Sequence, residues 1–415
     1  MIGFYRCAFI GDNVIALHAL YALRVCYPDE PLCIYTNTEG MQIFQPFAVW
    51  LTDESLGNGK IVCVDTETMS KQELLAHINA QDFSSFILTQ PNRWRCKLLN
   101  ASRVKRIITL ATLWNLPRPR FEKLLFSRSF SRFPYQQALL KLVRMIDKPH
   151  YDSTHIDFSR LQFPIDITAR NRVLHAISRA LESNSIHISM DSTQDSLLDS
   201  PKGSTLFHAG LDSKESSASL PPIICLNPFV RSSQINLPLH AHIALATHLA
   251  HRFPTTLVLL LTHKGAMRID IDSGTCAEST SSSSTKSRCN PLPNLKIFQN
   301  NENLANLIEL LRLSSLFISP STGPIHIANV LRIPIMGIYN HKDARLWLGD
   351  AMKREWLLLL ETPCTHLTTR QCHTALESAK SLCESILHEL GIQPQARENT
   401  SANNPTHQSA QARML

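Results

Sequence analysis

The chain has 415 residues, of which 44% are hydrophobic and 18% are charged, and its formal net charge is +7. These values are typical of a globular protein with two or three domains and exclude a disordered or fibrous chain. No apolar run approaches the roughly 20 residues that span a bilayer, and the N-terminus lacks the pattern of a signal peptide. We therefore expect a cytoplasmic protein.

Eleven cysteines, an odd number, are scattered over the chain, several of them inside apolar runs. This distribution indicates buried free thiols in a reducing compartment rather than a disulfide framework. A late group of cysteines and histidines suggests a metal site, but its spacing fits no standard zinc pattern: Cys364, His366, Cys372, His373 and Cys383. We expect no metal.

Positive charge is concentrated between Asn92 and Lys148, where fourteen Lys and Arg residues accompany only two acidic ones. A basic strip of this kind can face nucleic acid, anionic lipid head groups or a phosphorylated substrate. The alternative is an ordinary solvated surface.

In the N-terminal part of the chain, short apolar runs alternate with segments of helical spacing. The runs that predict strands are 3–10, 32–35, 61–64, 86–88 and 104–110. The segments that predict helices are 14–26, 70–80 and 135–146. Strands that alternate with helices imply a parallel sheet covered on both faces, so we predict the α/β class.

Residues 183–221 are rich in Ser, Asp, Gly and Lys and lose apolar periodicity, which predicts a flexible linker or an insertion. Ordered signals then resume, with a second low-complexity loop at 273–288. The predicted strands are 223–227, 256–261 and 295–298, and the predicted helices are 239–252, 303–313 and 377–390.

The stretch 314–339 predicts a strand, a Gly-containing turn, a helix and a second strand. Ser321 or Thr322 is the expected N-cap of this helix, and Pro324 its first residue. A helix that starts just after a parallel strand presents free N–H groups and its positive dipole end, which favour an anion. His326, about one turn into the helix, can reach the same anion. The alternative is an ordinary helix cap.

These signals divide the chain into five parts. They are an N-terminal α/β domain (1–165), a linker with a Ser/Asp-rich insertion (166–221), a C-terminal α/β domain (222–363), a helical segment (364–391) and a disordered tail (392–415). Ligands of such domain pairs bind in the cleft between them, at the carboxyl ends of the strands.

Two further turns are expected to line that cleft. In the turn at 11–13, Asp12 can cap the following helix, or it can act as a general base toward a hydroxyl nucleophile. A loop of the C-terminal domain is either an ordinary polar loop or a set of donors for a diphosphate: Arg231, Ser232 and Ser233.

Together these motifs resemble glycosyltransferase family 9, the bacterial ADP-heptose:lipopolysaccharide heptosyltransferases. The opening strand, GD turn and apolar helix of that family are similar to IGDNVIALHALYALRVCYP at 10–28. A loop of its C-terminal domain is similar to NPFVRSSQINLP at 227–238. Its most specific signature, a Gly-containing turn and a helix with a His, is similar to STGPIHIA at 321–328. The likeness covers most of residues 1–390 outside the two Ser-rich insertions.

The resemblance implies a GT-B fold, in which two Rossmann-like domains face each other across a cleft, and an inverting, metal-independent transfer. The N-terminal domain would hold the acceptor, and the C-terminal domain the nucleotide-sugar. Asp12 matches the general base of the family. The implied donor-binding residues, with Glu302 as the candidate for the ribose contact, are Arg231, Ser232, Ser233, Glu302, Ser321, Thr322, Gly323, Pro324 and His326. The implied acceptor-binding residues are Asn13, Asn92, Arg93 and Arg95.

Three positions depart from the family. Ser321 stands where the heptosyltransferases often have Asp, Ile235 where they have Lys, and Leu237 where they have Trp. The missing Lys removes a charge that would stabilise the leaving diphosphate, unless Arg231 replaces it.

We predict an inverting glycosyltransferase of heptosyltransferase type, which transfers a heptose from ADP-heptose to a lipopolysaccharide core (Kdo/heptose) acceptor at the inner membrane surface. We expect no cofactor and no nucleic-acid partner. The alternatives are a family member that uses another nucleotide-sugar for a surface glycan, a GT-B-fold nucleotide-sugar epimerase, and a catalytically degenerate nucleotide-sugar-binding protein. An epimerase would require further acid–base carboxylates beside Asp12. The sequence leaves the oligomeric state open.

Overall fold

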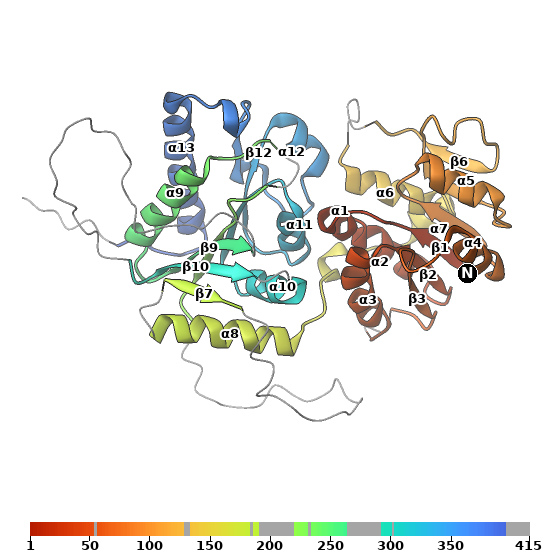
Figure 1. The fold of residues 1–415 in the computed structure, drawn as a ribbon, viewed down its shortest axis with the longest axis horizontal. Helices are drawn as coiled ribbons and strands as arrows, with labels where there is room; N and C mark the ends of the chain where they lie inside the picture. Colours follow the sequence, from red (N-terminus) through yellow and green to blue (C-terminus); the bar gives the residue numbers. More distant parts are fainter. Residues whose placement is uncertain are drawn as a thin grey trace, which may run out of the picture.

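The computed structural model describes residues 1–53, 56–127, 133–182, 186–190, 220–230, 234–263, 292–300 and 303–395. Within them the chain forms two α/β domains that lie next to each other along the long axis of the molecule (Figure 1). Each domain has a parallel sheet with helices packed on it. The prediction of an α/β chain with two Rossmann-like domains is confirmed.

The N-terminal domain is built on a six-stranded parallel sheet of order β3-β2-β1-β4-β5-β6. Its strands are β1 (Ile2–Tyr5), β2 (Leu32–Thr36), β3 (Ile61–Asp65), β4 (Ser85–Leu88), β5 (Ile107–Leu110) and β6 (Phe121–Leu124). Its helices are α1 (Ile10–Ile15), α2 (Leu17–Cys26), α3 (Thr38–Asp53), α4 (Lys71–Ala80), α5 (Arg93–Ala101), α6 (Tyr135–Arg144) and α7 (Lys148–Ser153), followed by the short 3-10 helix η1 (Phe158–Arg160). The central strand β1 is buried along its whole length, as expected of a parallel strand covered on both faces.

The C-terminal domain is built on a seven-stranded parallel sheet of order β13-β12-β11-β8-β9-β10-β7. Its strands are β7 (His187–Ser189), β8 (Ile223–Leu226), β9 (Leu257–His263), β10 (Leu295–Asn300), β11 (Leu316–Pro320), β12 (Ile335–Tyr339) and β13 (Leu357–Leu359). Its helices are α8 (Ile167–Glu182), α9 (Leu239–Arg252), α10 (Leu304–Arg312), α11 (Gly323–Val330), α12 (His341–Trp347) and α13 (Thr369–Glu389), with the 3-10 helices η3 (Arg354–Trp356) and η4 (Cys364–His366).

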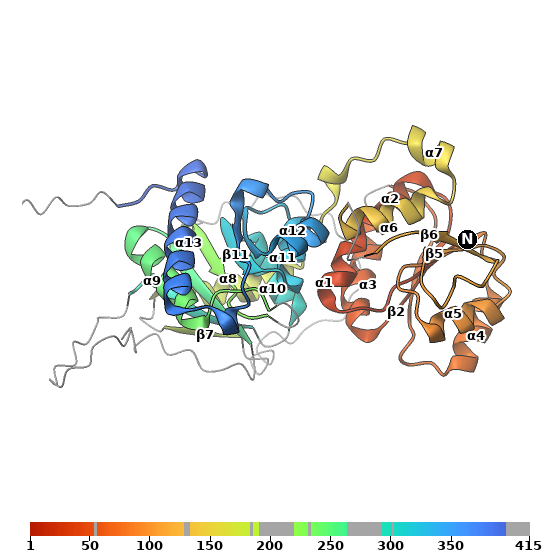
Figure 2. The ribbon, with the colours of Figure 1, turned by 90° about the horizontal axis from the view of Figure 1, so that it is seen from above.

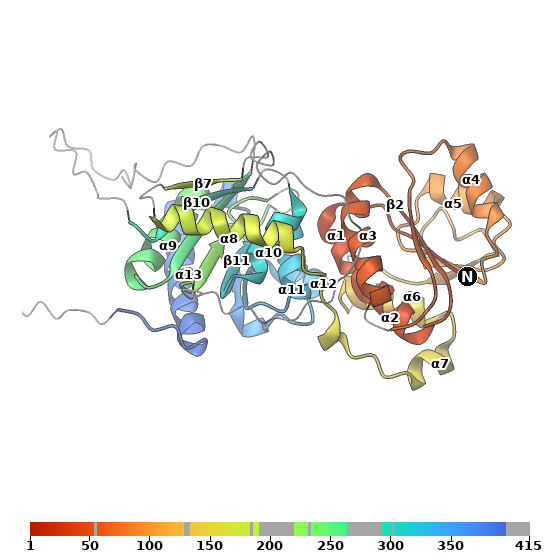
Figure 3. The ribbon, with the colours of Figure 1, turned by 90° about the horizontal axis from the view of Figure 1, so that it is seen from below.

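One apolar core runs through both domains. The cluster that fills one face of the first sheet, beneath α1, α2, α3 and α6, continues into the residues of α8, α10 and α11 on one face of the second sheet. Ile15 of α1 and Ile325 of α11 belong to this same cluster. In all three views α1 and α11 lie side by side at the domain boundary (Figure 1, Figure 2, Figure 3). A shared apolar core favours one fixed arrangement of the two domains.

The linker expected at 166–221 is corrected in its first part, because α8 and β7 belong to the C-terminal domain. The four-residue spacing of Ala169, Val173 and Ile177 gives α8 an apolar face, which is buried. The helix packs on α10, and the strand β7 pairs in parallel with β10 (Figure 3). The Ser-rich remainder, 191–219, and the loop 273–288 lie outside the described residues.

Several predicted boundaries are also shifted. The first strand ends at Tyr5 rather than at residue 10, and the helix predicted from 14 begins at Ile10 and is interrupted at Ala16. The last helix begins at Thr369, eight residues before the predicted start, because Thr368 forms a capping box with Gln371. Its end agrees with the prediction, since Gly391 has a positive φ of 76° just beyond it.

Two further expectations concern the cysteines and the membrane. The nine cysteines in the described part of the chain are all free, and six of them are buried. Among the described helices, none is long and apolar enough to cross a bilayer.

Candidate functional site

The candidate site lies where α1 of the N-terminal domain meets α11 of the C-terminal domain. Each helix follows a central strand of its sheet, β1 and β11, so that two strand–helix turns face each other. Gly11 and Gly323 allow this close approach, because a Cβ added to Gly11 would lie 2.9 Å from the Cα of Gly323 and 3.1 Å from Cδ2 of His326. Side chains on either turn are therefore within reach of the other domain.

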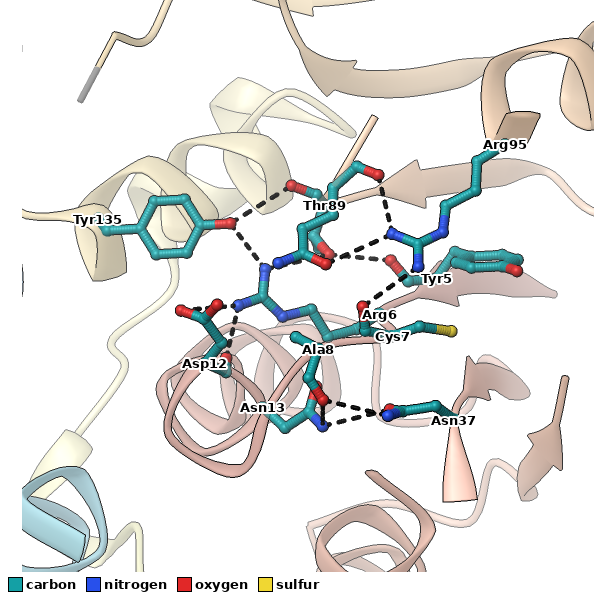
Figure 4. Close-up of polar contacts among 11 residues, drawn as sticks. Tyr5, Arg6, Cys7, Ala8, Asp12, Asn13, Asn37, Thr89, Arg95 and Tyr135 are labelled. Atoms are coloured by element: carbon teal, nitrogen blue, oxygen red, sulfur yellow. Dashed lines mark hydrogen bonds and ion pairs between the residues drawn. The ribbon is translucent and has the colours of Figure 1, made fainter. Parts of the chain in front are cut away.

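Asp12 stands in the first turn of α1, where its side chain is 23% exposed. The guanidinium of Arg6, at the end of β1, is completely buried beside it. Arg6 Nη2 donates a hydrogen bond of 2.6 Å to the backbone carbonyl of Asp12 and lies 3.6 Å from its carboxylate Oδ1 (Figure 4). The carboxylate is held next to a fixed cation while it keeps access to solvent, as a general base requires.

The turn before α11 has the form predicted for an anion site. Thr322 is the N-cap, but in the described structure its side chain makes no capping hydrogen bond to the helix. Its hydroxyl instead accepts from Asn227 Nδ2 at 3.2 Å and donates to the carbonyl of Pro320 at 3.3 Å. Pro324 has no N–H, and the N–H of Ile325 donates to the carbonyl of Thr322 at 3.2 Å. The N–H of Gly323 and the positive end of the helix dipole therefore remain to favour an anionic ligand.

The other predicted donor residues divide into two groups. Ser321 lies in the bend before α11 and is partly exposed, and Pro324 is the second residue of the helix rather than the first. The remaining four lie outside the described residues: Arg231, Ser232, Ser233 and Glu302. Ile235 and Leu237, which replace the Lys and Trp of the heptosyltransferases, are buried in the core of the C-terminal domain.

His326 is almost completely buried, at 8% exposure, where α11 meets α1. Burial lowers the pKa of His326 to about 4; the Asp12 carboxylate opposes this shift and His18 adds to it. The imidazole is therefore neutral near pH 7. It can serve an anion as a hydrogen-bond donor but not as a positive charge.

A polar contact between the domains lies next to this site. His18 Nε2 of α2 is 3.0 Å from Oδ1 of Asp350, and the carboxylate also binds Asn329 at 3.0 Å and Arg332 at 2.9 Å. Burial alone would raise the pKa of Asp350, but these three partners together hold it below its usual value. The carboxylate therefore stays ionised and ties α2 to the C-terminal domain.

Packing between the domains is close here. His18, His326 and Trp347, the last residue of α12, line a cavity of only about 10 Å³. That volume is near the minimum for one water molecule. The cavity has no room for a ligand larger than water, so such a ligand would have to bind on the open side of the turns.

The four acceptor-binding residues predicted from the sequence differ in their burial and in their hydrogen-bond partners. Asn13 is buried, with Nδ2 donating to the carbonyl of Ala8 at 2.8 Å, which does not fit a direct acceptor contact. Arg95 binds the backbone of Cys7 and Gln90, so it holds the ends of β1 and β4 together. Asn92 caps α5 and Arg93 is exposed at its start, where both can meet a ligand.

A separate open groove of about 470 Å³ runs along α3, just beyond the end of β2. Its lining residues are Thr38, Met41, Gln42, Gln45, Pro46 and Val49. It lies at the same carboxyl edge of the sheet as Asp12.

The late cysteines and histidines do not come together. Cys372 Sγ lies 3.4 Å from His240 Nε2, and the buried Cys383 contacts Met336 Sδ at 3.1 Å. Within the described ranges, no group of three His, Cys, Asp or Glu side chains could hold a metal ion.

Four residues at this boundary were missed from the sequence: Arg6, His18, Trp347 and Asp350. Only Arg6 carried a signal, since it is a charged residue at the end of an apolar strand run, IGFYR. Such a residue is buried only when it has partners.

No family model and no curated protein sequence matches the chain. Solved structures do. The glycosyltransferase family 9 protein from Veillonella parvula DSM 2008 has a TM-score of 0.62 and 13% identity, covering 94% of this chain and 97% of that chain. The E. coli ADP-heptose lipopolysaccharide heptosyltransferase II has a TM-score of 0.59 and 10% identity, covering 94% and 99%. The chain has a GT-B fold.

A third structure gives the same result: the E. coli heptosyltransferase WaaC with ADP-2-deoxy-2-fluoro heptose has a TM-score of 0.52 and 11% identity, covering 91% of this chain and 99% of that chain. At these identities the likeness is one of fold. The resemblance to glycosyltransferase family 9 noted in the sequence is thus confirmed at the level of the GT-B architecture.

The burial of His326 predicts a pH dependence of stability. Its folded pKa of about 4 lies below the ordinary value of 6.5, so between these values the unfolded chain holds more protons and stability falls as the pH falls. A His326→Gln variant is expected to lose about 2 kcal/mol less than the parent between pH 7 and pH 5, measured by urea unfolding. The exposed His251→Gln is the control and should behave as the parent does. Parallel curves for parent and His326→Gln would contradict the assignment.

The glycine contact predicts an asymmetry between two alanine variants. Gly11→Ala places its Cβ against backbone and is expected to lower the free energy of unfolding by about 1–3 kcal/mol. Gly323→Ala meets its nearest atom, the Gly11 backbone nitrogen, at 3.3 Å and should cost less. Equal effects of the two variants in denaturant unfolding would argue against this packing.

Proposed function

We propose that this chain is an inverting glycosyltransferase of heptosyltransferase type, which transfers a heptose from ADP-heptose to a lipopolysaccharide core acceptor. One observation carries the proposal. In a GT-B fold, Asp12 of one domain follows Gly11, which meets Gly323 of the other domain, and its carboxylate is close enough to the neutral His326 to act on the pKa of that imidazole. A base and an anion seat on opposite sides of one contact are what sugar transfer from a nucleotide requires.

In the proposed reaction, Asp12 takes the proton of the acceptor hydroxyl, whose oxygen attacks the anomeric carbon of the sugar. The bond from that carbon to the β-phosphate oxygen breaks, and its electron pair leaves with ADP. The N–H of Gly323 at the start of α11 and the imidazole of His326 are proposed to stabilise the developing charge on the diphosphate. Arg231, Ser232 and Ser233 are proposed to add to this stabilisation. The N-terminus of the helix and the hydrogen-bond donors then stabilise the charge on the diphosphate, as a metal ion does in other transferases. The proposal therefore includes no cofactor.

The names and bound ligands of the similar structures support ADP-heptose as the donor. Two of the E. coli proteins are heptosyltransferases, and WaaC was solved both with ADP and with a fluorinated ADP-heptose. The loss of the Lys, with Ile235 buried in its place, favours one alternative: the same fold acting on another nucleotide-sugar.

The surface near α5 supports an acceptor presented at an anionic membrane. Residues 92–127 contain nine Lys and Arg and one acidic residue. Four apolar side chains in the same region are exposed to between 48% and 81%: Leu113, Trp114, Leu116 and Leu125. The guanidinium of Arg93 lies over the Trp114 ring, 5.9 Å from its centre. Exposed leucines and a tryptophan interleaved with cations suit the head-group region of a bilayer.

The proposed donor predicts selective stabilisation of the protein by ADP ligands. We expect ADP and ADP-heptose to raise the melting temperature, and UDP and GDP at equal concentration to leave it unchanged. Asp12→Asn should keep this stabilisation but lower the transfer rate by about 10²–10⁴-fold, because only the base is removed. The exposed Asp82→Asn is the matched control and should transfer as the parent does.

Two results would contradict the assignment. If UDP raised the melting temperature instead of ADP, the donor would be a UDP-sugar and the proposed mechanism would be unchanged. If Asp12→Asn transferred sugar at the rate of the parent, Asp12 would not be the base and the proposed mechanism would be wrong.

The membrane surface predicts binding to anionic vesicles. The parent should sediment with vesicles that contain phosphatidylglycerol and remain soluble with pure phosphatidylcholine. The double variant Leu113→Ser, Leu125→Ser is expected to bind about tenfold less tightly, because two exposed apolar anchors are lost. Ile167→Ser, at a site 58% exposed on the C-terminal domain, is the control. Equal binding by the double variant would exclude this surface as the contact.

A further inference from the structure

We propose that Arg6 and Tyr135 are positioning residues for the carboxylate of Asp12, and that Trp347 makes their arrangement depend on the contact between the two domains. This inference rests on the proposed function, because it gives Asp12 the role of base. The observation behind it is a continuous set of contacts that runs from Asp12 through Arg6 and Tyr135 to Trp347.

Arg6 is the first link. It is completely buried, and its two terminal nitrogens serve different elements: Nη2 donates to the carbonyl of Asp12 in α1, and Nη1 donates to the hydroxyl of Tyr135 in α6 at 2.6 Å (Figure 4). A planar guanidinium cannot turn toward one partner without turning away from the other. The place of Asp12 is therefore set in part by the place of the Tyr135 hydroxyl.

Tyr135 is the second link. It is the first residue of α6 and is only 2% exposed. Its hydroxyl accepts from Arg6 and donates to the carbonyl of Thr89, just after β4, at 3.4 Å. The Arg6 guanidinium carbon also lies 5.3 Å from the centre of the Tyr135 ring. These contacts fix both the hydroxyl and the ring.

Trp347 is the third link, and it belongs to α12 of the C-terminal domain. Its ring meets the Tyr135 ring edge-on, with centroids 5.5 Å apart at 65°. The same indole lies 6.5 Å from the His326 ring, again edge-on, so it touches the proposed donor side as well. Edge-to-face aromatic pairs are favourable and directional. Trp347 thus contacts the residue that orients the base and the residue that faces the leaving group.

The consequence is a dependence of the base on domain contact. If the domains separate, Trp347 leaves the Tyr135 ring, and the tyrosine loses one of the surfaces that hold its hydroxyl against Arg6. The hydrogen bond from Arg6 to α1 is then less well oriented, and Asp12 is set for proton transfer only when the donor half is docked. Small displacements of a reacting group are costly, because a misplacement of about 1 Å can reduce a rate by about 10²-fold.

The test is Tyr135→Phe, which removes the hydroxyl and keeps the ring against Trp347. We expect kcat for sugar transfer to fall about tenfold while the KM for the donor stays close to that of the parent. The melting temperature should fall as well, because the buried Arg6 loses one of its acceptors. A purely structural role would lower the melting temperature and leave kcat unchanged. Tyr27→Phe is the matched control, since the buried hydroxyl of Tyr27 has no hydrogen-bond partner among the described residues.

A double-mutant cycle tests the link to the other domain. Trp347→Leu is expected to lower kcat, and the double variant with Tyr135→Phe should fall no more than about threefold below the worse single variant, because the two act through one path. Effects that multiply would overturn the role of Trp347. A Tyr135→Phe variant with parental kcat would overturn the whole inference, while an inactive Asp12→Asn would still leave the proposed function in place.

Discussion

The structure depends on the approach of two strand–helix turns that carry no side chain at the point of contact. Gly11 and Gly323 bring α1 and α11 so close that one added carbon would collide with backbone. Through this contact the apolar core of one domain continues into the other, and the carboxyl ends of two central strands meet. The carboxylate of Asp12, the turn of Thr322 and the ring of His326 lie beside those two glycines.

Burial disfavours positive charge at this boundary, and two buried groups differ because only one of them has acceptors around it. His326 has no cation-stabilising partner strong enough to offset burial, so its pKa falls and it stays neutral. Arg6 is buried as well, but Asp12, Tyr135 and Thr89 supply acceptors for it. A buried cation with partners is costly to disturb, because removing one partner leaves charge uncompensated. The boundary therefore combines a neutral hydrogen-bond donor on the C-terminal domain with a fixed cation on the N-terminal domain.

The fold is established by its likeness to solved structures, whereas the function is proposed from the residues of the candidate site. The GT-B architecture is shared with solved glycosyltransferases over more than 90% of the chain, yet at 10–13% identity it fixes the scaffold and not the chemistry. The proposed chemistry depends on Asp12, the N-terminus of α11 and His326. The departures at Ile235 and Leu237 are explained locally, because both side chains fill the core of the C-terminal domain and cannot serve a phosphate.

The amino-acid sequence by itself determined the class of the fold and the turns that carry the site. Alternating apolar runs and helical spacing are local properties, and the Gly-Asp and Ser-Thr-Gly-Pro-Ile-His motifs are contiguous in the chain, so both can be read without coordinates. It did not determine that α8 belongs to the C-terminal domain, that Asn13 is buried, or that Arg6 binds both Asp12 and Tyr135, the latter 129 residues further along the chain. Those outcomes depend on which distant surfaces pack together, and burial, charge partners and pKa shifts arise only from that packing.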